Sequence, residues 1–182
     1  MNQRKIVKYS TIRGDQRDVT GGHGTYVAGV VAGYTRSGDN EAVGVAPDAK
    51  LHIIDVSKGN ADQMISPSPQ EILRSMYNNG NGAKIANGSW STKYKAYPTS
   101  CRFFDNELYD HQDVLYVASA GNTGRTKNMN ASQMKTVGNP AACKNTLAVG
   151  ASQSDGDRIE QEDMGSDFLA MFSSRGPTAD GK

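Results

Sequence analysis

The residues best suited to chemistry in this sequence include a histidine set between glycines, in the segment Gly21–Gly29 (GGHGTYVAG). Apolar residues recur at positions 26, 27, 30, 31 and 34, which predicts a buried helix that begins at His23 and runs to about Tyr34. The dipole of a helix disfavours positive charge at its N-terminus, so the imidazole is expected to be neutral near pH 7. Because a neutral imidazole can accept a proton, His23 is a candidate general base.

Asn122 is the second candidate. It follows the apolar run 114–118, which predicts a strand covered on both faces. A side-chain amide on the turn after such a strand can donate a hydrogen bond to negative charge developing on a carbonyl oxygen. The alternative is that Asn122 is an ordinary turn residue, because glycine and asparagine, which are common in turns, make up most of the sequence Gly121-Asn122-Thr123-Gly124.

The elements that must position these residues alternate between strand and helix. Strands are predicted at 6–10, 51–56, 84–89, 114–118 and 146–151. The first predicted helix follows His23, and a second begins at Pro69 and ends at Asn79-Gly80. A third helix is expected to be capped by Ser100. In the second helix, four apolar side chains share one face: Ile72, Leu73, Met76 and Tyr77. The third helix carries the apolar residues Phe103, Phe104 and Leu108.

This alternation predicts an α/β fold with a mostly parallel sheet and crossover helices on both faces. Such sheets bind ligands beyond the carboxyl ends of their strands. Ser89 ends one predicted strand and Asn122 follows another, so both are expected at that edge.

The His23 segment resembles the histidine motif of the subtilisin-like serine peptidases (subtilases, peptidase family S8). Further blocks of this family follow in the family's order: Gly44–Leu51 (GVAPDAKL), Ala118–Asn122 (ASAGN), Val137–Ala141 (VGNPA) and Phe172–Pro177 (FSSRGP). The resemblance implies a subtilisin-like three-layer α/β/α fold and serine endopeptidase activity on polypeptides. His23 would be the general base and Asn122 the oxyanion donor.

The resemblance also implies a substrate cleft. Asn87–Ser91 (NGSWS) resembles the segment that pairs with extended substrate backbone, as an added strand does. Ser89, Trp90 and Ser91 would form one wall of the primary specificity pocket, and Ala120 with Gly121 the other. Many relatives carry glycine where this chain has Ser91, whose hydroxymethyl group would narrow the pocket. The alternative for Trp90 is that its ring packs in the core and does not contact substrate.

Two parts of the family's catalytic triad have no counterpart in this sequence. The triad follows the chain order Asp, His, Ser, but neither Asp15 nor Asp18 stands in the expected strand and motif. The Gly-Thr-Ser-like nucleophile segment would follow Pro177 and is not found. We therefore expect residues 1–182 to be the central part of one peptidase domain, inactive alone because a triad acts as a unit.

Two other functions share features with this sequence. A non-catalytic peptide-binding protein derived from the same fold is the alternative to the peptidase. A dinucleotide-binding domain is disfavoured because the glycine pattern around His23 would need a glycine at Val27.

Composition narrows the partners. A net charge of +1 does not predict nucleic-acid binding, and the sequence has no run of 18 apolar residues and no visible signal peptide. Cys101 and Cys143 are as compatible with free buried thiols as with one disulfide, and no cofactor or metal-ligand pattern is identified. The acidic stretch from Asp155 to Asp167 favours a solvated surface over a calcium loop, so structural calcium is not assigned. The resemblance suggests a secreted protein.

Overall fold

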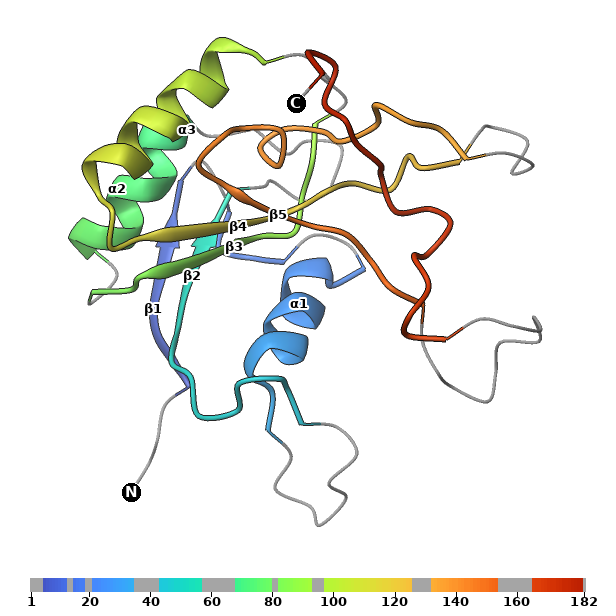
Figure 1. Cartoon of the computed structure of the whole chain (residues 1–182). Helices are drawn as coiled ribbons and strands as arrows, with labels where there is room; N and C mark the ends of the chain where they lie inside the picture. Colours follow the sequence, from blue (N-terminus) through green and yellow to red (C-terminus); the bar gives the residue numbers. More distant parts are fainter. Residues whose placement is uncertain are drawn as a thin grey trace. The chain divides into compact units, whose positions relative to one another are not determined.

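A computed structural model describes residues 5–12, 15–18, 21–34, 43–56, 68–79, 82–92, 97–125, 132–153 and 165–181. The chain divides into two compact units, residues 1–83 and 84–182, and each is described by itself. Figure 1 follows the helices and strands along the chain from β1 to β5.

The first unit contains a parallel pair of strands, β1 (Ile6–Thr11) and β2 (Leu51–Asp55). The pairing continues past β1, where the Ile12 N–H donates to the Asp55 carbonyl (2.8 Å). The predicted strands at 6–10 and 51–56 are therefore confirmed, as is their parallel direction.

Helix α2 (Pro69–Asn79) also lies in the first unit, at the predicted position. Its start is closed by a reciprocal pair: the Glu71 N–H donates to Ser68 Oγ (3.2 Å), and the Ser68 N–H donates to Glu71 Oε2 (2.8 Å). Proline at the first helical position adds to this signal. The N–H of that position has no acceptor within the helix, so a residue without an N–H costs no hydrogen bond there. The predicted apolar face is buried at Ile72, Leu73 and Met76.

Helix α1 (His23–Ala32) begins where it was predicted but is not buried. Tyr26 is 70% exposed, Val30 48% and Tyr34 68%, and Ala32 is the buried residue of the helix. The prediction of a buried helix is therefore wrong for the described chain. Helical spacing identifies side chains that share a face, but burial depends on which other segments cover that face.

The second unit contains three parallel strands in the order β3 (Ile85–Gly88), β4 (Leu115–Ser119) and β5 (Leu147–Val149). Helix α3 (Thr99–Asp110) covers one face, where the rings of Phe104 and Tyr116 lie 4.9 Å apart (Figure 1). The burial of β4 alternates, with Tyr116 buried and Leu115 40% exposed. The prediction of a strand covered on both faces is wrong in this respect.

The start of α3 also differs from the prediction. The extended residue Pro98 occupies the cap position and makes no side-chain cap bond, so Ser100 lies inside the first turn. The Cys101 N–H donates to the Pro98 carbonyl (3.0 Å), which closes that turn through the backbone.

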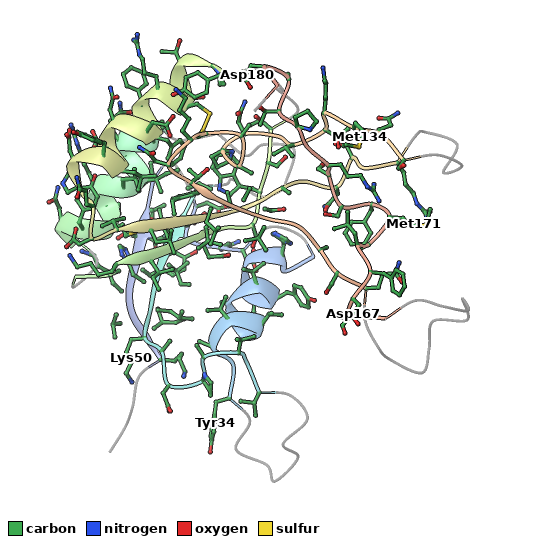
Figure 2. The ribbon with its side chains drawn as sticks, in the orientation of Figure 1. Tyr34, Lys50, Met134, Asp167, Met171 and Asp180 are labelled. Carbon is green, nitrogen blue, oxygen red and sulfur yellow. A yellow bond between two sulfur atoms is a disulfide. The ribbon has the colours of Figure 1, made fainter. Side chains whose placement is uncertain are left out.

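Covalent and polar links join α3 to the segment before β5. Cys101 and Cys143 form a disulfide, which decides between the two alternatives left open by the sequence (Figure 2). One turn further along α3, the Asn145 N–H donates to Asp105 Oδ1 (2.8 Å), and the Tyr97 hydroxyl donates to the other carboxylate oxygen. These links hold the 139–146 segment against the helix.

Among the described residues, none of the helices has the length and apolar character that crossing a membrane requires.

Candidate active site

His23 lies at the start of α1, in the first unit. Gly22 caps the helix in the left-handed conformation (φ 68°), which favours glycine because it has no Cβ. The carboxylate of Asp18 satisfies two backbone donors of the first turn, Gly24 N–H (3.1 Å) and Thr25 N–H (2.6 Å). The glycines and Asp18 together define the backbone on both sides of His23 and leave the histidine itself exposed.

The sequence analysis gave Asp18 no role, because it does not stand in the strand and motif expected of the triad aspartate. It stands five residues before the histidine, and an acidic residue just ahead of a helix is a recognisable capping signal. The structure assigns it to the helix terminus.

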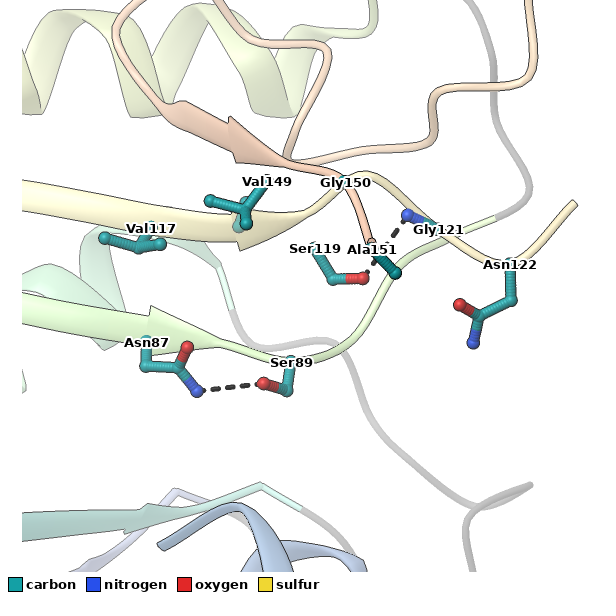
Figure 3. A pocket seen from close by; sticks show the side chains of 10 residues that line it. Asn87, Ser89, Val117, Ser119, Gly121, Asn122, Val149, Gly150 and Ala151 are labelled. Atoms are coloured by element: carbon teal, nitrogen blue, oxygen red, sulfur yellow. Dashed lines mark hydrogen bonds between the residues drawn. The ribbon is translucent and has the colours of Figure 1, made fainter. Parts of the chain in front are cut away.

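The second unit forms a pocket at the carboxyl ends of β3, β4 and β5, with a volume of about 220 Å³ (Figure 3). This is the edge at which parallel sheets bind ligands, as predicted. The lining combines small polar and small apolar side chains: Asn87, Ser89, Val117, Ala118, Ser119, Gly121, Asn122, Val149, Gly150 and Ala151.

Asn122 is exposed at this pocket, on the turn that leaves β4. Within the described residues its side-chain amide forms no hydrogen bond and is available to a ligand. Gly121 precedes it with φ 107°, a conformation that disfavours side chains, and its N–H points to Ser119 Oγ (3.3 Å). Ser119 therefore supports the turn, a role that sequence reasoning missed although the residue directly follows a predicted strand.

Four of the predicted substrate-binding residues lie around this turn. Ser89 and Gly121 line the pocket. Ala120 is buried behind it, and its N–H donates to the Val149 carbonyl (2.9 Å). Ser91 is exposed, and its hydroxyl lies 3.2 Å from the place that a Cβ on Gly121 would occupy. The structure thus brings the two predicted walls together at Gly121.

Trp90 is half-buried and makes a side-chain hydrogen bond with the hydroxyl of Tyr116. Burial raises the pKa of Tyr116 well above its ordinary value, so the phenol stays protonated. Trp90 is therefore hydrogen-bonded to a core residue of the second unit while itself half-buried, and the two roles considered from the sequence both stay predictions. It does not line the described pocket.

A buried carboxylate, Asp55, ends β2 in the first unit and was not singled out from the sequence. It accepts the Gln16 N–H at 2.8 Å. Burial, followed by the negative charge of Asp55, raises the pKa of Tyr9 above its usual value. Asp55 thus anchors the loop between β1 and α1.

No group of three or more His, Cys, Asp and Glu side chains suited to a metal ion occurs in the described part of the chain. Most of the acidic stretch Asp155–Asp167 lies outside the described residues, so the expectation of a solvated surface there stays a prediction. Asp167, which is described, is exposed.

Comparison with known sequences identifies the chain's relatives. The profile of the subtilase family matches residues 3–182. The chain is 32% identical over 153 residues to the serine protease/ABC transporter B family protein tagA of Dictyostelium discoideum, covering 82% of this chain and 8% of that protein. It is 28% identical over 163 residues to subtilisin DY of Bacillus licheniformis, covering 89% and 55% respectively. The chain therefore spans about half of this subtilisin and a small part of the Dictyostelium protein.

Solved structures agree on the fold. The protease domain of PatA superposes with a TM-score of 0.64 at 22% identity, covering 95% of this chain and 55% of that one. The psychrophilic subtilisin-like protease Apa1 from Pseudoalteromonas sp. AS-11 has a TM-score of 0.58 at 28% identity, covering 84% and 29%. These likenesses confirm the predicted subtilisin-like α/β fold. With a family profile that matches nearly the whole chain, this protein belongs to the subtilase family of serine peptidases.

Proposed function

We propose that the chain is the central part of a serine endopeptidase domain, in which His23 is the general base and Asn122 donates to the oxyanion. The observation that carries this proposal is the side-chain amide of Asn122, which forms no hydrogen bond with the described residues and is exposed on a glycine turn at the carboxyl end of β4. A donor that need not break an existing bond to act can stabilise charge as it develops in the transition state.

The geometry around His23 supports the second role. Asp18 and Gly22 hold the backbone of the first helical turn, while His23 is exposed. A base must be accessible to the proton that it removes, and it gains from a fixed backbone. We assign the triad's aspartate and serine to no residue of this sequence, and propose that the whole gene product supplies them.

The substrate is proposed to be a polypeptide bound in extended form. Among the described strands, β3 forms one edge of the three-stranded sheet, and Ser89 follows it directly into the pocket. An extended peptide can add to such an edge through main-chain hydrogen bonds. The Cys101–Cys143 disulfide supports a secreted or otherwise oxidising location, since disulfides persist in such compartments.

The test uses the full-length gene product, a fluorophosphonate probe for nucleophilic serines and a set of chromogenic peptide substrates. Labelling and turnover are expected in the unmodified protein. His23→Ala should abolish both, and Asn122→Ala should lower kcat by about 10²–10³-fold, the loss known for removing an oxyanion donor from a subtilisin. His111→Ala, a histidine at the end of α3, is the matched control.

Peptide binding without labelling or turnover would instead support the non-catalytic alternative.

A further inference from the structure

The Phe172–Pro177 segment, which the proposed function leaves without a role, lies beside the Asn122 turn. The Ser174 N–H donates to the carbonyl of Gly121 at 2.8 Å. The Ser174 hydroxyl accepts the N–H of Thr123 at 3.2 Å. One residue therefore holds the two neighbours of Asn122, on either side, although it is 52 positions away in the sequence (174 minus 122).

The protons in this cluster can be assigned from the number of donors. Thr123 Oγ1 donates to the Thr136 carbonyl (3.2 Å) and has no second hydrogen to give. The contact between the Thr123 and Ser174 hydroxyls (3.2 Å) must then use the hydrogen of Ser174. Ser174 thus donates one bond to Thr123 and accepts another from it, and both bonds depend on its hydroxyl.

Packing makes the arrangement specific. Ser174 is 6% exposed, so its polar groups cannot exchange these partners for bulk water. A Cβ on Gly121 would lie 2.9 Å from Ser174 Oγ, so the glycine allows the hydroxyl to approach the turn. The side chain of Asn122 meanwhile remains outside this cluster and exposed.

Arg175 supports the far end of the same turn. Its guanidinium donates from Nη1 to the carbonyls of Gly124 (2.8 Å) and Met171 (3.1 Å). Its backbone pairs in both directions with Thr136, through Thr136 N–H to the Arg175 carbonyl (2.8 Å) and Arg175 N–H to Thr136 Oγ1 (2.8 Å). The segment that carries Ser174 is therefore itself fixed in place.

From this geometry we propose that Ser174 is a positioning residue for Asn122, which it orients by binding Gly121 and Thr123. The inference rests on the proposed oxyanion role of Asn122 and gives that role a structural origin. An oxyanion donor acts only within a narrow range of distance and direction, so small shifts of its turn lower the rate.

The test is a double-mutant cycle on the full-length gene product. Ser174→Ala should lower kcat about tenfold with KM nearly unchanged, part of the loss expected for removing an oxyanion donor. In an Asn122→Ala background the same substitution should lower kcat less than about twofold, because its effect passes through Asn122. Equal losses in both backgrounds would overturn the proposal.

Ser173→Ala is the matched control. Ser173 is also buried, and its hydroxyl accepts one backbone N–H, from Ala151 (3.0 Å), which lines the pocket but is not part of the 121–124 turn. It should lower the melting temperature about as much as Ser174→Ala does, with a smaller change in kcat. Should Ser174→Ala fail to fold, Ser174→Cys keeps an atom of similar size with weaker hydrogen bonding, and an intermediate loss of kcat is expected.

A readout without turnover separates this inference from the proposed function. In NMR spectra, Ser174→Ala should speed amide exchange at Thr123 and shift the side-chain amide resonances of Asn122, whereas Ser173→Ala should not. Unmoved Asn122 resonances would refute the positioning role. Absence of turnover in the unmodified protein, with the resonances moving as expected, would count against the peptidase assignment alone.

Discussion

The phenol ring of Tyr116 in β4 lies against the backbone of Gly88 in β3. A Cβ on residue 88 would come within 2.9 Å of the ring carbons Cε1 and Cζ, closer than real Cβ atoms approach. Tyr116 is 2% exposed and also contacts Phe104 of α3, so it cannot move away freely. Because Ser89 follows Gly88 directly into the pocket, this contact helps to set where the chain leaves the sheet.

Gly88→Ala is therefore expected to destabilise the protein by about 1–3 kcal/mol, the usual cost of overpacking. Urea denaturation measures the change. Gly29→Ala is the control: it lies within α1 with nothing within 4 Å of the added Cβ, and alanine there should be neutral or stabilising by up to about 1 kcal/mol. Equal effects at the two positions would argue against the Tyr116 contact.

Stability should fall at high pH through Tyr97. Its hydrogen bond to Asp105, followed by burial, raises the pKa of Tyr97 from 10.0 to about 12. The folded pKa exceeds the unfolded one, so the contribution of Tyr97 is complete below pH 10 and is lost as the pH rises toward 12. Unfolding free energies at about pH 9 and pH 11 should differ more in the unmodified protein than in Tyr97→Phe. The effect of Tyr116 on stability at high pH is present in both proteins and cancels in the comparison. If the unfolding free energy depended on pH identically in the unmodified protein and in Tyr97→Phe, the role of Tyr97 would be contradicted.

Removing the Cys101–Cys143 disulfide should destabilise the second unit. The two residues are 42 positions apart, and releasing a loop of that size restores unfolded-state entropy worth about 4 kcal/mol. Cys101→Ala/Cys143→Ala should thus unfold at lower urea concentration. A reductant should have the same effect on the unmodified protein and none on the double variant; a response of the double variant would mean that the reductant acts elsewhere.

Asp18→Ala should loosen the first turn of α1. The loss of a helix-capping side chain typically costs about 1 kcal/mol. Amide exchange at Gly24 and Thr25, whose N–H groups donate to Asp18, should become faster. Asp15→Ala is the matched control from the same loop, since Asp15 accepts only the nearby Arg17 N–H (3.2 Å) among the bonds described for it. Unchanged exchange at both amides would show that Asp18 does not cap the helix in solution.

Local pattern predicted the elements well. The periodicity around Ile72, Leu73 and Met76 identified α2 and its buried face, and the apolar runs at 51–56 and 114–118 identified β2 and β4. These succeed because helical and strand spacing are properties of neighbouring residues. The same reasoning failed for the burial of α1 and of β4, where coverage by distant segments decides.

The polar site was predicted in part. Ser89 and Asn122 were expected at the carboxyl ends of parallel strands, and together with Gly121 they line one pocket there. The contribution of Ser119 was missed because a serine at a strand end carries no distinctive pattern. The role of Ser174 was missed because its partners lie far away in the sequence, at Gly121 and Thr123.

By itself the sequence determined the α/β class, the family and the type of residue at each candidate position, since motif order and local spacing are written along the chain. Tertiary structure alone decided that Cys101 bonds Cys143, that Tyr116 requires Gly88, and that Ser174 holds both neighbours of Asn122. Contacts of this kind join segments distant in sequence. They depend on how the backbone brings those segments together, which spacing along the chain does not specify.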